Sequence, residues 1–104
     1  MDQKPTSESD KTVRAHVRAK GRVQGVGFRA HVEYHARKIG GLTGWVRNVG
    51  YDTVEAMVEG ERSSVERLID AIRAGPRGSR VDETNVEWGP PTGEFLQFGV
   101  TRSA

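Results

Sequence analysis

The sequence predicts an α+β fold in which two helices cover one face of an antiparallel sheet. Three observations predict it: several segments alternate between apolar and polar residues, two others carry apolar residues at helical spacing, and glycine or proline separates them. The segments follow one another as strand, helix, strand, strand, helix and strand, with a further edge strand at the end. This βαββαβ order is that of the ferredoxin-like sandwich.

The first strand and the first helix are joined by a glycine-rich loop. Over 12–20, Val13, Ala15, Val17 and Ala19 share one face, which predicts a strand with one buried side. Three glycines within the seven residues 21–27 then demand unusual backbone geometry. A helix is expected over about 28–39, where Phe28, Val32, Ala36 and Ile39 form an apolar stripe. Gly40-Gly41 ends it.

The next three elements are two strands and a helix. Strands are predicted over 43–49 and 53–59, with a short turn between them. In the second of these, alternate residues point to opposite faces: Val54, Ala56 and Val58 on one, Glu55, Met57 and Glu59 on the other. The second helix is expected to begin near Ser63 or Ser64, either of which could cap it, and Gly75-Pro76 ends it.

Two strands complete the predicted sheet. The segment 82–88 places Thr84, Val86 and Trp88 on one side, and Gly89-Pro90-Pro91 breaks it. The segment 95–101 is expected to form the terminal edge strand.

The composition indicates one small domain. The 104 residues are expected to fold as a single unit over 12–102, after a mobile tail over 1–11 that is rich in polar residues. There is no cysteine, which excludes disulfides and cysteine-based metal sites and permits a cytoplasmic location. No apolar run is long enough to cross a membrane. The net charge of +2 suits a small anionic ligand better than nucleic acid, because no block of Lys and Arg forms.

The glycine-rich loop has the layout of an anion site. It lies between a strand and a helix N-terminus, where backbone N–H groups and the helix dipole can act on one oxyanion. Arg29 falls in the first helical turn, where a cation is mildly unfavourable unless an anion lies beside it. Spacing alone leaves a second interpretation open, in which Arg29 is an ordinary exposed arginine. The loop follows neither the Walker pattern nor the dinucleotide fingerprint.

Two motifs resemble those of the acylphosphatase family. Residues 21–29 read GRVQGVGFR and match the family's first signature, G-x-V-Q-G-V-x-F-R, at every specified position. Residues 44–48 read GWVRN and resemble the start of its second signature. The resemblance extends from about residue 12 to residue 102 and includes the order of the predicted elements.

This resemblance implies an enzyme that hydrolyses acyl phosphates to a carboxylate and inorganic phosphate. Arg29 is expected to bind the phosphate and Asn48 to position the attacking water. The other expected phosphate contacts come from the backbone of the loop, at Val23, Gln24, Gly25, Val26, Gly27 and Phe28. The enzyme is expected to need no cofactor or metal, to act as a monomer, and to be inhibited by inorganic phosphate, its product.

The sequence departs from the family pattern at two places. The family has a glycine in the turn after the asparagine, where this chain has Asp52, a residue that tolerates positive φ better than most. The joint Gly40-Gly41-Leu42 is one residue longer than usual. A bulge is expected to absorb the extra residue.

Other features have weaker functional interpretations. His31 and His35 have metal-ligand spacing but no obvious third ligand, so surface histidines are favoured. Trp45 and Trp88 are expected in the core or on a sheet face rather than against a ligand. An RNA-binding domain is the main rival function, but 53–59 carries none of the aromatic residues that such sheets use. A regulatory domain that binds a small anion without turnover is the other.

Overall fold

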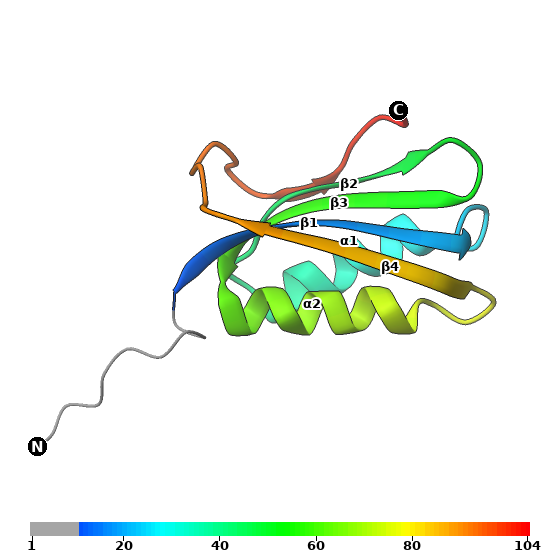
Figure 1. Ribbon diagram of the computed structural model, residues 1–104, viewed down its shortest axis with the longest axis horizontal. Coiled ribbons are helices and arrows are strands. Elements are labelled where there is room, and N and C mark those ends of the chain that lie inside the picture. Colours follow the sequence, from blue (N-terminus) through cyan, green and yellow to red (C-terminus); the bar gives the residue numbers. More distant parts are fainter. Residues whose placement is uncertain (1–10) are drawn as a thin grey trace, which may run out of the picture.

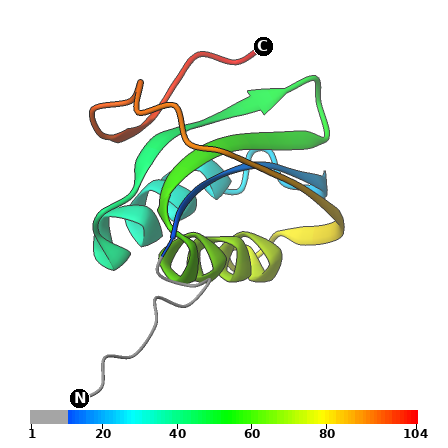
Figure 2. The ribbon, with the colours of Figure 1, turned by 60° about the vertical axis from the view of Figure 1, so that its left-hand side comes forward.

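The computed structural model describes residues 11–104. Its elements, in chain order, are β1 (Thr12–Arg22), α1 (Phe28–Ile39), β2 (Thr43–Val49), β3 (Thr53–Glu61), α2 (Arg62–Ala74), β4 (Arg80–Gly89) and β5 (Phe98–Val100). They form one five-stranded sheet in the order β4-β1-β3-β2-β5. Both helices lie against the same face of this sheet, as Figures 1 and 2 show. The predicted fold class, an α+β ferredoxin-like sandwich, is confirmed.

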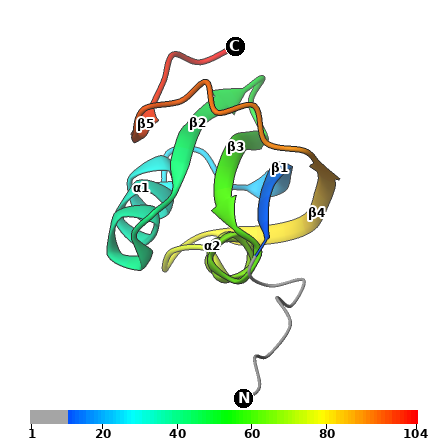
Figure 3. The same cartoon turned by 90° about the vertical axis from the view of Figure 1, so that its left-hand side faces the viewer.

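The sheet is mixed, which corrects the prediction of an antiparallel one. β1, β3, β2 and β4 pair antiparallel, but β5 runs parallel to β2 through Gly44↔Phe98 and Val46↔Val100. The chain reaches β5 from β4, at the opposite edge of the sheet. Segment 90–97 crosses the face away from the helices, as Figure 3 shows, and this crossing sets the direction in which β5 enters.

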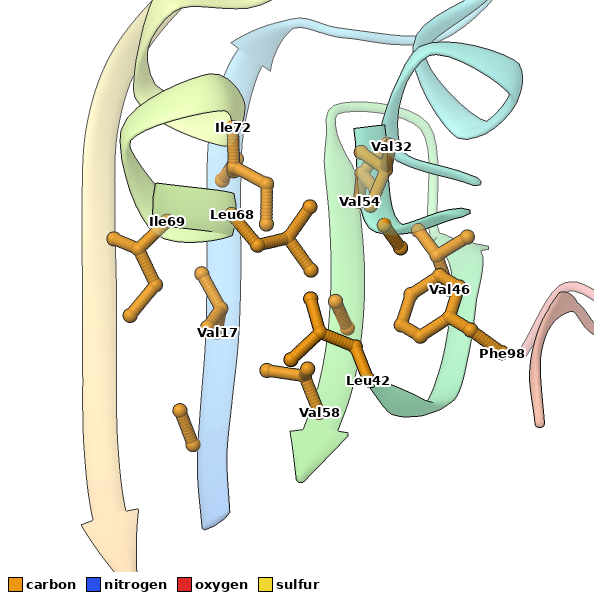
Figure 4. Close-up of a cluster of buried hydrophobic side chains, with 14 of the residues drawn as sticks. Val17, Val32, Leu42, Val46, Val54, Val58, Leu68, Ile69, Ile72 and Phe98 are labelled. Atoms are coloured by element: carbon orange, nitrogen blue, oxygen red, sulfur yellow. The ribbon is translucent and has the colours of Figure 1, made fainter. Parts of the chain in front are cut away.

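The core lies between the helices and the inner face of the sheet. Valines of the strands face apolar side chains of both helices, as Figure 4 shows. The strands contribute Val17, Val46, Val54 and Val58, and the helices contribute Val32 of α1 and Leu68 and Ile72 of α2. These positions repeat every two residues in the strands and every three or four in the helices, as the sequence predicted. The burial of these apolar side chains is the main source of the fold's stability.

Several boundaries differ from the predicted ones. β1 continues to Arg22, past an irregularity between Lys20 and Gly21, and β4 begins at Arg80, because these ends pair with each other. β5 covers three residues instead of the predicted seven, because the preceding segment is still crossing the sheet. α2 begins at Arg62, so Ser63 and Ser64 lie inside it and the N-cap position is held by Glu61, without a side-chain bond.

The outer face of the sheet carries buried charge. Glu55 and Glu59 of β3 are only 6% and 4% exposed. They point away from the apolar core, as their alternation with Val54, Ala56 and Val58 predicted. Glu55 accepts hydrogen bonds from His16, at 2.5 Å, and from Arg47, at 2.8 Å. Neighbouring strands therefore supply the partners of this carboxylate.

Glu59 fastens the crossing segment to the sheet. Its carboxylate accepts hydrogen bonds from the backbone N–H groups of Thr92 and Gly93, at 2.8 and 3.0 Å, and from the Thr92 hydroxyl, at 3.0 Å. Burial alone raises the pKa of Glu59, but these bonds and the charge of Arg14 outweigh it and bring the pKa below its ordinary value. The ionised form is thus the one that holds the segment.

The two tryptophans lie on sheet faces, as expected. The guanidinium of Arg47 lies 4.7 Å from the ring centroid of Trp45, and that of Arg62 lies 4.1 Å from the ring centroid of Trp88. Trp88 is 39% exposed. Both contacts are cation–π pairs within the fold.

The predicted mobile tail, residues 1–11, lies outside the described residues except for Lys11, whose carbonyl accepts a hydrogen bond from the Arg62 N–H. Within the described part of the chain, no helix is long and apolar enough to cross a membrane.

Gly44 is required by its surroundings. It has a φ of 135°, and a Cβ built on it would lie 1.8 Å from the carbonyl oxygen of Met57 on the neighbouring strand. We expect Gly44→Ala to lower the free energy of unfolding by about 2–4 kcal/mol, because it adds both backbone strain and a clash with main chain. Urea unfolding measures this. Gly89→Ala, at an open position with ordinary φ, is the control, and equal effects of the two changes would contradict the account.

The lowered pKa of Glu59 predicts a pH dependence of stability. A carboxyl whose folded pKa is below its unfolded pKa stabilises the fold above the unfolded value and loses this contribution as pH falls through the folded value. We therefore expect Glu59→Gln to be less stable than wild type at neutral pH, with the difference closing as pH falls from neutral to below the ordinary pKa of a glutamate side chain. Urea unfolding at several pH values measures it. A stability difference between the two proteins that stays constant across that pH range would show that the ionisation of Glu59 does not contribute to stability.

Candidate active site

The loop between β1 and α1 is shaped by two glycines. Gly25 and Gly27 have φ values of 75° and 78°, in the left-handed region that other residues adopt only at a cost. A Cβ on either glycine would meet no atom within 4 Å. Backbone conformation, rather than lack of space, therefore requires glycine at these positions.

The amides of this loop are free to bind a ligand. The first backbone hydrogen bond of α1 is donated by the His31 N–H to the carbonyl of Gly27, the last residue of the loop, at 3.0 Å. Within residues 11–104, the backbone N–H groups of residues 24–30 have no acceptor. Gly27, at the N-cap position, offers no side chain to satisfy them. These donors, together with the dipole of α1, form an anion-binding element.

A pocket of about 310 Å³ opens at this loop. Its lining comes from the loop, the first two turns of α1, the end of β2 and β5: Val23, Gly25, Gly27, Phe28, Arg29, Ala30, Glu33, Asn48 and Val100. The structure thus brings Arg29 and Asn48 into one pocket, although 19 positions separate them in the sequence. Among the described residues, neither side chain has a hydrogen bond or an ion pair with another group.

Strand pairing explains the position of Asn48. It lies two residues after Val46, which is fully buried, so both side chains are on the helix-covered face of β2. Asn48 is paired with Val54 at the turn end of the β2–β3 hairpin. Figure 1 shows this turn and the loop before α1 at the same end of the molecule. The side chain of Asn48 therefore lines the same pocket as Arg29, which lies in the first turn of α1.

Gln24 links the loop to this hairpin. Its side-chain Nε2 donates to the carbonyl oxygens of Thr53, at 2.9 Å, Gly50, at 3.1 Å, and Val49, at 3.3 Å. The Gly21 N–H donates to the Asp52 carbonyl, at 2.9 Å, beside these bonds. Sequence reasoning placed only the backbone of Gln24 at the site and missed its side chain. Its length and amide group, within a loop otherwise made of glycine and valine, were the available signal.

The remaining predicted loop residues divide into two groups. Val23, Gly25, Gly27 and Phe28 line the pocket, whereas Gln24 and Val26 do not. The Val26 side chain packs against the core. Their backbone N–H groups nevertheless belong to the run of unpaired amides described above.

Glu33 is a pocket residue that sequence reasoning missed. It lies one helical turn after Arg29, and its carboxylate accepts a hydrogen bond from Arg37 at 3.1 Å. The spacing of four residues on a helix was the signal that could have found it. Arg37 neutralises much of this negative charge at the rim of an otherwise cationic site.

The two departures from the motif pattern do not disturb the pocket. The positive φ in the β2–β3 turn belongs to Gly50, at 62°, and no residue other than glycine has one among residues 11–104. The β2–β3 hairpin therefore forms with Asp52 in its turn, and the positive φ that the turn requires is supplied by Gly50. Gly40 and Gly41, with φ values of 83° and 73°, take up the extra residue before β2 begins, and the β2–β3 pairing continues without a bulge.

The histidines of α1 serve the packing of the helices. His31 Nε2 lies 2.9 Å from the Ala71 carbonyl oxygen of α2, and its ring lies edge-on to that of His35 at 4.5 Å. Burial, together with the charges of His31 and Lys38, lowers the pKa of His35. In the part of the chain that the structure describes, no group of three or more His, Cys, Asp or Glu side chains could hold a metal ion.

Comparison with known proteins identifies the family. The family model described as acylphosphatase matches residues 15–100. The chain belongs to the acylphosphatase family. It is 47% identical to an acylphosphatase of Roseiflexus sp. over 84% of this chain and 92% of that protein, and 51% identical to one of Thermococcus kodakarensis over 80% and 90%. The crystal structure of acylphosphatase from Bacillus subtilis superposes with a TM-score of 0.81 at 30% identity, over 86% of this chain and 98% of that one.

These comparisons confirm the family that the two motifs indicated. The chain is an enzyme of this family, a hydrolase that acts on small acyl phosphates. The matched range, residues 15–100, includes both motifs and every helix and strand except the first three residues of β1. The two rival functions, RNA binding and anion binding without turnover, find no support in it.

Proposed function

We propose that the pocket between the β1–α1 loop and β2 hydrolyses acyl phosphates, with Arg29 and the loop amides binding the phosphoryl group and Asn48 positioning the attacking water. One observation carries this proposal. Unpaired backbone N–H groups, a guanidinium and a carboxamide, none of them engaged elsewhere in residues 11–104, line or adjoin one pocket.

The chemistry of the substrate explains why these few groups suffice. An acyl phosphate is a mixed anhydride, and its leaving carboxylate has a conjugate acid of pKa about 4–5. Such a group departs without being protonated, so a general acid is dispensable. The transition state of phosphoryl transfer is loose, with its charge spread over the phosphoryl oxygens, so positioning and charge stabilisation supply most of the catalysis.

Arg29 is the group that fits the phosphoryl oxygens. A guanidinium can donate two parallel hydrogen bonds to one phosphate, which the ammonium group of lysine cannot do. Its place in the first turn of α1 is unfavourable beside the positive end of the helix dipole. An anion held between the two removes this repulsion, and the unpaired amides of residues 24–30 adjoin the same pocket, which supports their binding to the same anion.

Asn48 is the group that fits the water. Its carboxamide oxygen can accept a hydrogen bond from a water and hold it in line with the P–O bond that breaks. The water's oxygen bonds to phosphorus, the carboxylate departs with the electron pair of the broken bond, and the water's proton passes to a phosphate oxygen. The amide does not ionise, so it serves over a wide range of pH.

Three further proposals concern inhibition by phosphate, oligomeric state and location in the cell. Inorganic phosphate carries the oxygens that the loop binds, so it is expected to act both as product and as competitive inhibitor. The groups proposed for the reaction, Arg29, Asn48 and the loop amides, come from one copy of the chain, so we propose that a monomer is sufficient for activity. A cysteine-free sequence suits the reducing cytoplasm, where we place the enzyme.

Replacing Arg29 tests phosphate binding. We expect Arg29→Ala to abolish measurable release of phosphate from benzoyl phosphate and to raise the dissociation constant of inorganic phosphate, measured by calorimetric titration, because about 2–4 kcal/mol of charge-assisted bonding is lost. Assays contain EDTA, and Arg22→Ala, an exposed arginine next to the loop, is the control. A dissociation constant of phosphate equal to that of wild type in the calorimetric titration of Arg29→Ala would rule out the assigned role.

Replacing Asn48 tests the placement of the water. We expect Asn48→Ala to lower kcat on the order of 10²–10³-fold while the inhibition constant of phosphate stays near that of wild type. Steady-state kinetics with benzoyl phosphate measures both. Asn85→Ala, on β4 and outside the pocket, should leave kcat unchanged. A weaker affinity for phosphate with unchanged kcat would instead assign Asn48 to substrate binding.

A further inference from the structure

We infer that the side chain of Gln24 is a positioning residue: it sets the distance between the loop that holds the phosphate and the strand end that carries Asn48. This inference rests on the proposed function of the site. Gln24 does not line the pocket, so it acts on the reaction through the groups that its side chain holds in place.

The contacts of the Gln24 carboxamide all lie on the β2–β3 hairpin. Nε2 approaches the carbonyl oxygens of Val49, Gly50 and Thr53 at 3.3, 3.1 and 2.9 Å. These residues are 25 to 29 positions away in the sequence, and Val49 directly follows Asn48. An NH₂ group has two hydrogens, so the three carbonyls share two donors. One side chain therefore ties both sides of the turn to the loop.

The three carbonyl oxygens converge on a single nitrogen. The bonds to Val49 and Thr53 are part-buried and the bond to Gly50 is exposed, so loss of the donor would weaken the solvation of the two part-buried carbonyls most. The other links between β1 and the turn all lie before the loop: the strand pairing that ends at Lys20↔Thr53, the Gly21 N–H bond to the Asp52 carbonyl, and the Lys20–Asp52 ion pair at 3.9 Å. Among the described residues, loss of the carboxamide would leave the loop itself, residues 23–27, without a hydrogen bond to the turn, and would let the two move relative to one another.

The shape of the loop itself has a different origin. The left-handed conformations of Gly25 and Gly27, and the start of α1, direct its amides. Neither depends on the side chain of residue 24. A change of this side chain should therefore alter the placement of Asn48 relative to the phosphate, and leave the affinity for phosphate almost unchanged.

Gln24→Met tests this separation, because methionine has a similar length and no N–H donor and keeps the backbone amide. We expect kcat for benzoyl phosphate to fall on the order of tenfold, with the inhibition constant of inorganic phosphate within about twofold of wild type. Gln97→Met makes the same chemical change at an exposed residue outside the pocket, and should leave both constants unchanged.

A double-mutant cycle shows whether Gln24 acts through Asn48. In an Asn48→Ala background, we expect Gln24→Met to lower kcat by less than about twofold, because the group that it positions is already gone. Equal reductions of kcat in the two backgrounds, or a rise in the inhibition constant of phosphate that matches the loss of activity, would overturn the inference.

Two further measurements keep the test decisive. If Gln24→Met does not fold by circular dichroism, Gln24→Asn replaces it in the same cycle, because its carboxamide is one methylene too short to reach the turn. Failure of the proposed function is recognised separately: wild type would then release no phosphate from benzoyl phosphate, or Asn48→Ala alone would leave kcat unchanged. The inference about Gln24 fails on its own when both of those results are as expected and the cycle is additive.

Discussion

The antiparallel pairing of β1 with β3 is the constraint on which the rest of the structure depends. It runs from Thr12↔Glu61 to Lys20↔Thr53 without a change of register. The loop that follows β1 and the turn that precedes β3 must therefore meet at one end of the sheet. β2 pairs with the other side of β3 with equal regularity, and this brings Asn48 to the same end. A site assembled from distant parts of the chain thus follows from the register of three strands.

Buried charge on the outer face protects that register. A slip of one residue would turn every side chain of β3 to the opposite face. It would place the carboxylates of Glu55 and Glu59 among the valines under the helices, where no partner is available, and a buried unpaired charge costs far more than a lost apolar contact. In the observed register, His16, Arg47 and the amides of Thr92 and Gly93 satisfy these carboxylates. The same slip in β2 would turn Asn48 away from Arg29.

The sequence predicted what short-range patterns determine. Alternation identified the faces of the strands, the apolar stripe and glycines gave α1 its observed bounds, and the element order brought Arg29 and Asn48 together. Contacts between residues far apart in the sequence could not be predicted from such patterns. The bonds of Gln24 join residues at least 25 positions apart, and the parallel pairing of β5 depends on how segment 90–97 crosses the sheet. Residue type gave the wrong start for α2. Ser63 and Ser64 favour helix caps, yet α2 begins at Arg62, directly after the end of β3.

The extra glycine lies at the end of α1 that is remote from the active site, where an added residue is tolerated. Gly40 and Gly41 lie after the last residue of α1, a helix of 12 residues and therefore about 18 Å long. Arg29 lies in its first turn, at the far end. The two glycines adopt positive φ in open space, so they absorb the added residue without shifting Leu42 from the core or β2 from its register. The other end has no such freedom, because side-chain and backbone bonds from Gln24 and Gly21 tie the loop to the turn. Variation in length is thus accommodated where the chain makes few tertiary bonds, and the geometry that hydrolysis requires is fixed where it makes several.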